Sequence, residues 1–447
     1  MSQDLRWWLR VCALVFTFSL SGLAPRSAFA VPSYSGQTGA PCASCHTAAF
    51  GVSLTPFGQQ FKLNGYVWGD AKASYVPVSA MVISSFTHTA AKQDGGAAEH
   101  FAENNNTALD QVSLFYTHRI SEHIGVFVQG SYDGVAQRIA WDNLDIRYAN
   151  TAQVAGRNLV WGISANNNPT VQDLWNTTPA WSYPYIGSAL APTPGASPII
   201  EGSLAQQVYG LTGYTMIDNH LYLEAGLYKT LTGTLLSKLG VGRDSASPIK
   251  GVAPYWRAAW QGQQGANREA VGVFGIATRQ FPGNDQSAGT NRYTDFGYDA
   301  TYGHTSGAQD VLVQGTVVHE LQKLNATHAL GGSDNLSNQL NTTRLNAQYT
   351  WQQTYAGSVG AFAIHGSPDA TLYGTASGSP NSRGYIAQLE FVPFGKAGSR
   401  LAPHLNVRTG LQFTYYTQFD GSARNYDGAG RSAHDNNTLF GFLWLAL

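Results

Sequence analysis

The chain has 447 residues, of which 12% are charged, and it contains 49 glycines, 23 tyrosines, 20 phenylalanines and 11 tryptophans. Soluble domains carry about 25% charged residues, so this composition argues against an ordinary cytosolic enzyme. The net charge of −1 also makes nucleic acid a poor partner. Beyond residue 30 there is no run of about 18 apolar residues, which excludes a helical membrane protein. A glycine- and tyrosine-rich chain with few, scattered charges is typical of a β-barrel in an outer membrane.

The first thirty residues predict an export signal. Arg6 and Arg10 flank the start of an apolar stretch that runs from Val11 to Ala24. Ala28-Phe29-Ala30 then supplies small residues at the two positions that a signal peptidase reads. The alternative, a short membrane anchor, would need a longer apolar run. We expect cleavage after Ala30, so that the mature chain begins at Val31 and is exported.

Two cysteines remain beyond this signal, Cys42 and Cys45, and His46 follows directly. Cys-Ala-Ser-Cys-His is the C-x-x-C-H attachment sequence of c-type haem. Its spacing lets two thiols reach the vinyl groups of one porphyrin edge and places the imidazole under the iron as proximal ligand. Competing interpretations are a disulfide, a thioredoxin-like redox pair and half a zinc site, but the sequence offers no βαβ context and no second cysteine pair. We therefore predict one covalently bound haem c, held by Cys42, Cys45 and His46.

The predicted haem segment spans residues 31–75. At about 45 residues, it is near the size at which a chain needs a disulfide, a metal or a bound cofactor to fold alone. It also contains few apolar residues that could form a core. Phe57, Phe61 and Asn64 have the spacing of one short helix after Ser53-Leu54-Thr55. We expect the aromatic rings of this segment to pack around the haem. We also expect the segment to pack against a larger part of the chain for stability.

From residue 76 to residue 447 the pattern changes to stretches of about ten residues with period-two alternation, separated by turns. This predicts an all-β chain, and the number of stretches is even, as bacterial outer-membrane barrels require. The sixteen expected strands are 78–87, 107–119, 123–132, 141–149, 157–165, 206–216, 220–230, 251–261, 268–279, 293–303, 309–321, 343–353, 355–365, 383–393, 403–417 and 437–447.

The connections between these stretches alternate between short and long, as in a membrane barrel with short periplasmic turns and long outer loops. Short connections are expected at 121–122, 218–219 and 304–308, and long ones at 91–106, 166–205, 323–342 and 418–436. A soluble β-sandwich is the alternative, but sixteen strands exceed ordinary sandwich sheets. One feature counts against a barrel, because the last strand ends in Leu447 rather than in an aromatic residue.

A barrel of sixteen strands leaves a real lumen. The small haem segment is joined directly to the first strand, so we expect it to enter from the periplasmic side and to plug the lumen. This arrangement would place a redox centre inside an insulating membrane.

The chain also resembles a known family. The stretches Gln37-Thr-Gly-Ala-Pro-Cys-Ala-Ser-Cys-His46, Leu54-Thr-Pro-Phe-Gly58 and Phe61-Lys-Leu-Asn-Gly-Tyr66 resemble the fused monohaem cytochrome c–porin family of iron-oxidising bacteria, and residues 166–181 resemble that family's long loop. The resemblance implies an outer-membrane electron conduit that oxidises extracellular Fe(II) and passes the electron to a periplasmic cytochrome. If such a chain is an enzyme, it is an Fe(II):cytochrome c oxidoreductase. Its partners would be the electron donor, the periplasmic carrier and outer-membrane lipid.

Two other functions stay open. A related cytochrome–porin would use another donor or carry electrons in the opposite direction, and a diffusion porin would hold the haem as a structural group. Acidic and imidazole side chains in the predicted loops, among them Asp94, Glu99, His100 and Asp173, are the kind of ligands that iron accepts. Outer loops are commonly polar, so we name none of them as an iron site.

The sequence leaves three possibilities for the distal iron ligand. Met81 lies on the first strand and shares a face with small polar residues, which we expect to line the lumen. A thioether raises a haem potential relative to a second imidazole, which suits a weak reductant such as Fe(II). His88 at the barrel rim is a second candidate, and an iron with water or an open site is the third possibility.

Overall fold

The structure is a computed structural model that describes residues 32–69, 75–242, 247–399, 401 and 405–447. The predicted signal peptide, residues 1–30, lies outside the described residues.

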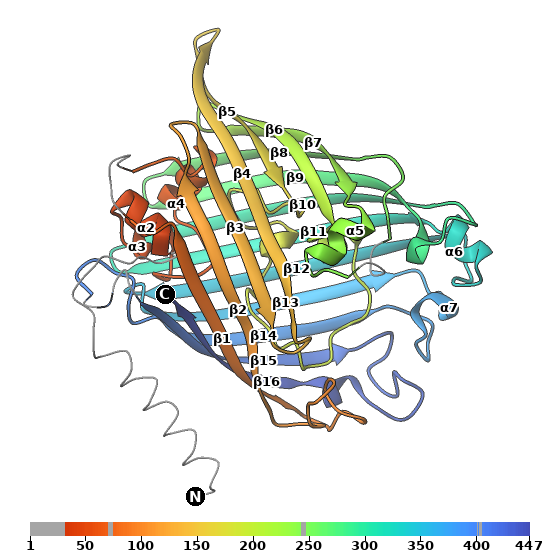
Figure 1. The fold of residues 1–447 in the computed structure, drawn as a ribbon. Coiled ribbons are helices and arrows are strands. Elements are labelled where there is room, and N and C mark those ends of the chain that lie inside the picture. Colours follow the sequence, from red (N-terminus) through yellow and green to blue (C-terminus); the bar gives the residue numbers. More distant parts are fainter. Residues whose placement is uncertain (1–31, 70–74, 243–246, 400, 402–404) are drawn as a thin grey trace, which may run out of the picture.

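Within the described residues, sixteen antiparallel strands form one closed barrel, in which each strand pairs with its neighbours in sequence and β1 pairs with β16 (Figure 1). Every predicted stretch overlaps one of these strands, so the predicted all-β fold class is confirmed, and the fold is that of a sixteen-stranded outer-membrane porin barrel. The strands are β1 (Val78–Thr89), β2 (Asn106–Arg119), β3 (Ile124–Asp133), β4 (Arg138–Val154), β5 (Arg157–Asn166), β6 (Val208–Ile217), β7 (Leu221–Thr230), β8 (Ala253–Gln264), β9 (Asn267–Gln280), β10 (Asn291–Ser306), β11 (Gln309–Lys323), β12 (Ser337–Trp351), β13 (Tyr355–Gly366), β14 (Ser382–Phe391), β15 (Asn406–Gln418) and β16 (Thr438–Ala446).

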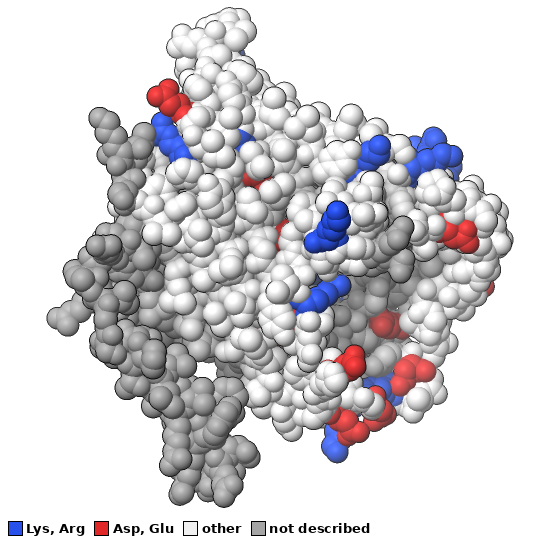
Figure 2. Space-filling view, in the orientation of Figure 1, with Lys and Arg blue, Asp and Glu red and all other residues white. Residues whose placement is uncertain are grey.

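Alternation along the strands points apolar side chains outward and polar ones inward. In β14, for example, Tyr385 and Leu389 are exposed on the outer face, whereas Gln388 and Glu390 are buried on the inner face. This is the reverse of a soluble β-protein and is the pattern of a barrel in lipid. The wall that Figure 2 shows carries few charges, and most of the coloured side chains gather toward the end opposite the grey N-terminal trace.

The turns are short at the barrel end where β16 finishes and are mostly long at the other end, as predicted. Two connections break this alternation. Residues 134–137 join β3 to β4 in only four residues on the long-loop side. Residues 392–405 form a long connection on the short-turn side, where Gly395 accepts a hydrogen bond from the backbone N–H of Ala43 at 3.0 Å. The second exception therefore exists where the wall meets the haem segment.

Three short helices form the described part of the haem segment, at the barrel end where the C-terminus lies (Figure 1). They are α2 (Pro32–Thr38), α3 (Cys42–Cys45) and α4 (Pro56–Leu63), and loop helices elsewhere are α5 (Gly233–Lys238), α6 (Asn325–Ala329) and α7 (Ala370–Tyr373). No described helix is long and apolar enough to cross a membrane.

Helix α4 is the helix that the sequence predicted, but a different face is buried. Thr55 caps its N-terminus by accepting a hydrogen bond from the Gly58 N–H at 3.3 Å, and Pro56 occupies the first turn, where its missing N–H costs nothing. Phe61 is buried as expected, whereas Phe57 is 42% exposed and packs edge-on against Trp68. Phe57 also does not line the cavity next to Cys42 and Cys45, so the expectation that it packs around a haem stays a prediction.

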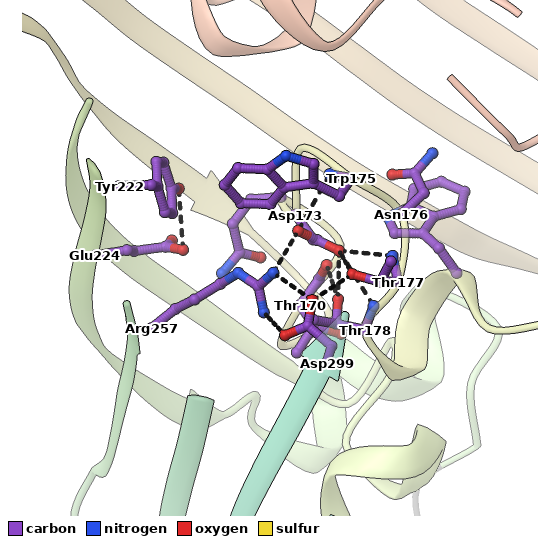
Figure 3. Close-up of polar contacts among 12 residues, drawn as sticks. Thr170, Asp173, Trp175, Asn176, Thr177, Thr178, Tyr222, Glu224, Arg257 and Asp299 are labelled. Carbon is purple, nitrogen blue, oxygen red and sulfur yellow. Dashed lines mark hydrogen bonds and ion pairs between the residues drawn. The ribbon is translucent and has the colours of Figure 1, made fainter. Parts of the chain in front are cut away.

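The connection between β5 and β6, residues 167–207, is here called the inner loop because it packs against the inner face of the wall. Asp173 of this loop is fully buried and pairs with Arg257 of β8 at 3.2 Å, and Arg257 also pairs with Asp299 of β10 at 2.8 Å (Figure 3). Further along, the Ile200 N–H donates to the carboxylate of Asp295. Asp173, which the sequence placed among the polar side chains of the outer loops, is thus part of a buried ion-pair cluster.

Candidate haem site

Cys42, Cys45 and His46 occupy a single helical turn. The His46 N–H donates to the Cys42 carbonyl at 3.0 Å, and the Thr55 N–H donates to the Cys45 carbonyl at 2.9 Å. Gly58 packs directly on this turn, because a Cβ added there would lie 2.4 Å from the Cys45 carbonyl oxygen. The backbone of α4 therefore holds the three predicted attachment residues in place.

These three side chains line one cavity of about 460 Å³, here called the Cys–His cavity. The volume falls within the range of pockets that hold cofactors and drug-sized ligands. The lining includes apolar side chains, among them Phe50, Met81, Ile83, Phe115, Phe127 and Trp444. It also includes polar side chains, among them Lys62, Gln111, Gln129, Asp142, Asn143 and Asn176.

Both cysteines are free, so the competing disulfide does not form in this structure. Burial raises the pKa of the Cys42 thiol to about 11 and that of Cys45 to about 12. A redox-active cysteine pair depends on a lowered thiol pKa, which makes a nucleophilic thiolate available at neutral pH. The site is therefore poorly suited to thioredoxin-like chemistry.

His46 fits an iron ligand. Burial, and secondarily the charge of Arg408, lowers the pKa of His46 to about 4, so the imidazole is neutral at pH 7 and is free to coordinate. Its Nδ1 is buried and, among the described residues, has no hydrogen-bond partner. Metal coordination at a ring nitrogen is one way to compensate such a group without a hydrogen bond.

Met81 faces this site, whereas His88 does not. Met81 is 7% exposed and lines the Cys–His cavity. It packs in one hydrophobic cluster with Phe50 and Trp444, whose rings lie edge to face with their centres 5.0 Å apart. His88 lies on the outer face of β1, exposed, with its Nδ1 at 2.7 Å from the Asn105 side-chain oxygen. The structure thus separates the two distal-ligand candidates by the alternation of a single strand.

Wall side chains bind the backbone of the haem segment. Arg408 of β15 donates to the Phe50 carbonyl at 2.7 Å while it pairs with Glu390. Arg147 of β4 donates to the Lys62 carbonyl at 2.9 Å while it pairs with Asp145 at 2.8 Å. Further bonds come from the hydroxyl of Tyr214 to the Leu63 carbonyl and from Gln353 to the Ala43 carbonyl. In the opposite direction, the hydroxyl of Tyr34 in the haem segment donates to the Val126 carbonyl of the wall. Backbone carbonyls that a free peptide would expose to water are satisfied here by the wall.

Lys62 is the functional candidate that sequence reasoning missed. A lysine on a short helix is ordinarily expected in solvent, but Lys62 is only 6% exposed. The one available signal was position, because Lys62 follows Phe61 on the face of α4 that the structure buries. Over the described ranges of the chain, no group of three or more His, Cys, Asp or Glu side chains is placed to hold a metal ion.

No protein-family model matches the chain, and no curated protein sequence matches it. Among solved structures, it is similar to OmpT, an outer membrane protein of Vibrio cholerae, with 10% identity over 82% of this chain and 95% of that chain, at a TM-score of 0.42. It is also similar to an anion-selective porin from Comamonas acidovorans, with 11% identity, 83% and 98% coverage and a TM-score of 0.44. OmpF of Salmonella typhi in complex with daunomycin gives 12% identity, 83% and 97% coverage and a TM-score of 0.46. The assignment of the fold rests on the strand pairings of this chain and not on these likenesses.

Proposed function

We propose that this chain is an outer-membrane electron conduit, which passes electrons from extracellular Fe(II) to a periplasmic electron-carrier cytochrome. The observation that carries the proposal is the convergence of Cys42, Cys45 and His46 on one cavity between the haem segment and the inner wall. The resemblance of residues 37–66 to the cytochrome c–porin family of iron-oxidising bacteria supports the choice of donor.

In this proposal Cys42 and Cys45 hold a haem c through thioether bonds, and His46 is the proximal iron ligand. A bound haem supplies a one-electron couple whose potential depends on its axial ligands and on the burial of the site. The neutral imidazole of His46 offers a ring nitrogen, and apolar side chains such as Phe115 and Trp444 line the cavity beside it. We assign Met81 as the distal ligand because it lines the same cavity on the wall side.

The haem segment is proposed to plug the barrel lumen from the periplasmic side. Support comes from the hydrogen bonds that wall arginines make to Phe50 and Lys62, and from the position of the segment at the barrel end with the short turns. Short turns face the periplasm in bacterial outer-membrane barrels. The outward apolar side chains of the strands support a place in outer-membrane lipid.

Oxidation outside the periplasm suits Fe(II) because Fe(III) is insoluble near neutral pH. Charged side chains gather at the outer-loop end of the barrel (Figure 2), which suits the approach of a hydrated cation. The chain then needs only to carry one electron across, while the metal stays outside.

Stopped-flow mixing of the ferric protein with Fe(II) tests the proposal. We expect reduction of the haem spectrum by Fe(II), and no spectrum at all in a Cys45→Ala variant, which should also lose haem staining on a denaturing gel. Full staining of that variant would overturn the attachment. A wild-type haem that Fe(II) does not reduce would overturn the choice of donor.

A diffusion porin with a structural haem is the second candidate, favoured only by the barrel architecture itself. The two functions differ in permeability, because a plugged barrel excludes solutes that an open porin admits. Liposomes containing the protein should not swell in sugar solutions if the plug is present. Swelling at the rate of an open porin would favour the second candidate.

A further inference from the structure

Lys62 is a buried lysine whose ammonium group is bound but not paired with a carboxylate. Its Nζ donates to the carbonyl of Val171 at 2.9 Å and to the side-chain oxygen of Asn176 at 3.1 Å. It also lies 4.8 Å from the centre of the Trp181 ring. All three partners belong to the inner loop, so Lys62 is enclosed between α4 and that loop.

Three buried carboxylates act electrostatically on Lys62: Glu224, which accepts a hydrogen bond from the Tyr222 hydroxyl at 3.1 Å, and two aspartates that are held in ion pairs. Asp145 pairs with Arg147, and Asp173 pairs with Arg257. No ion pair among the described residues includes Lys62. Burying an ammonium without an anion is costly, and this cost is visible in the lysine itself, because burial lowers its pKa to about 7. If Lys62 served only to anchor the inner loop, an uncharged side chain could take its place.

The position of Lys62 suggests which anion is missing. Among the described residues that line the Cys–His cavity, Lys62 is the only lysine or arginine, and Asn176, which accepts a hydrogen bond from it, lines the same cavity. A haem is amphiphilic, because its ring is apolar and one edge carries two propionate carboxylates. A cavity lined by many apolar side chains and by a single cationic one therefore matches the two parts of the cofactor.

We propose that Lys62 is the counter-charge of a haem propionate, and that it sets the reduction potential of the site while it ties the inner loop to the haem. This inference rests on the proposed function, since it requires a haem in the Cys–His cavity. A charge-assisted bond between the ammonium and a propionate would offset the desolvation that burial imposes on both groups. The ammonium would also neutralise the negative charge of the propionate near the iron. This stabilises the reduced state and raises the reduction potential.

The test is a spectroelectrochemical titration of the purified holoprotein in detergent, with resonance Raman spectra of the propionate bending band. Lys62→Gln should lower the midpoint potential and shift the propionate band, because the propionate loses its cation. Lys62→Arg should restore most of both. Lys396→Gln is the matched control, because Lys396 is half-buried and also donates to a backbone carbonyl, that of Gln352, but does not line the Cys–His cavity.

Unchanged potential and Raman band in Lys62→Gln would overturn the proposal. Loss of the low-spin iron signature in Lys62→Gln would also overturn it, because the amine would then be an iron ligand. Haem staining on denaturing gels distinguishes failure of the Lys62 proposal from failure of the proposed function, because covalent attachment of the haem does not depend on Lys62. Wild-type protein without stainable haem would overturn the proposed function itself.

Discussion

Replacing Arg147 with methionine should release the haem segment from the barrel wall. The Arg147 side chain is fully buried and binds three oxygens, those of Asp145 at 2.8 Å, the Lys62 carbonyl at 2.9 Å and the Gln172 carbonyl at 2.6 Å. It therefore joins the wall, the haem segment and the inner loop through one guanidinium. Methionine fills similar space but leaves Asp145 as a buried, unpaired carboxylate.

Breaking a buried ion pair by removing one partner costs about 3–5 kcal/mol. The lost bonds to the two carbonyls are part of the same network, so we do not add them separately. At about 1.4 kcal/mol per factor of ten, the fraction of molecules with an undocked haem segment should rise by roughly 10²- to 10³·⁵-fold. This holds if the cost falls on docking rather than on the barrel as a whole.

Limited proteolysis of the folded protein in detergent measures that fraction, because cleavage follows the population of the open form when opening and closing are fast. Cleavage within residues 32–69 should accelerate in Arg147→Met. Arg268→Met is the matched control, because Arg268 forms a largely buried pair with Asp310 at 2.7 Å and binds Thr305, both on the wall. Equal cleavage rates in the wild type and both variants would refute the reasoning.

Three further predictions concern the Cys–His cavity. Gly58→Ala should lower the haem content per barrel, measured as the pyridine haemochrome, because the new Cβ would lie 2.4 Å from the Cys45 carbonyl oxygen, and Gly187→Ala, where a Cβ meets nothing within 4 Å, should leave it unchanged. Met81→Leu should abolish the near-infrared magnetic circular dichroism band of a methionine–iron bond, and a band that survives would rule out Met81 as ligand. In a haem-free Cys45→Ser variant, docking of the haem segment should strengthen as pH rises from about 7 to 10.5, because the pKa of Lys62 falls from its usual 10.5 to about 7 on burial and the undocked segment then binds more protons. A protease cleavage rate that is flat across this window, or that falls equally in Lys62→Met, would contradict the assignment.

The barrel could be predicted from the sequence because its signal is local and repeated. Period-two alternation in a strand such as β14 depends only on residues two apart, and the strand must place Leu389 in lipid and Gln388 in the lumen. The attachment motif is equally local, since Cys42, Cys45 and His46 lie within one turn. The alternation of side chains along β1 predicted that Met81 faces the lumen, where it lines the same cavity as these three residues.

The contents of the lumen could not be predicted in the same way, because they depend on contacts between distant segments. Asp173 and Lys62 look like solvated side chains in sequence, and only Arg257 on β8 and Val171 on the inner loop explain their burial. The exposure of Phe57 was missed for a related reason, since the orientation of α4 buries Gly58, Phe61 and Lys62 instead. The glycine allows that orientation by its close approach to Cys45.

The most direct test of the central claim is electron transfer across a membrane that contains only this protein. Proteoliposomes would enclose oxidised soluble cytochrome c, with Fe(II) added outside, and reduction of the enclosed cytochrome would be followed by its visible absorption. We predict reduction with the wild type and none with Cys45→Ala or His46→Ala, whose barrels should still insert. Reduction that proceeds equally in the two variants, or a wild type that carries haem but leaves the enclosed cytochrome oxidised, would contradict the account.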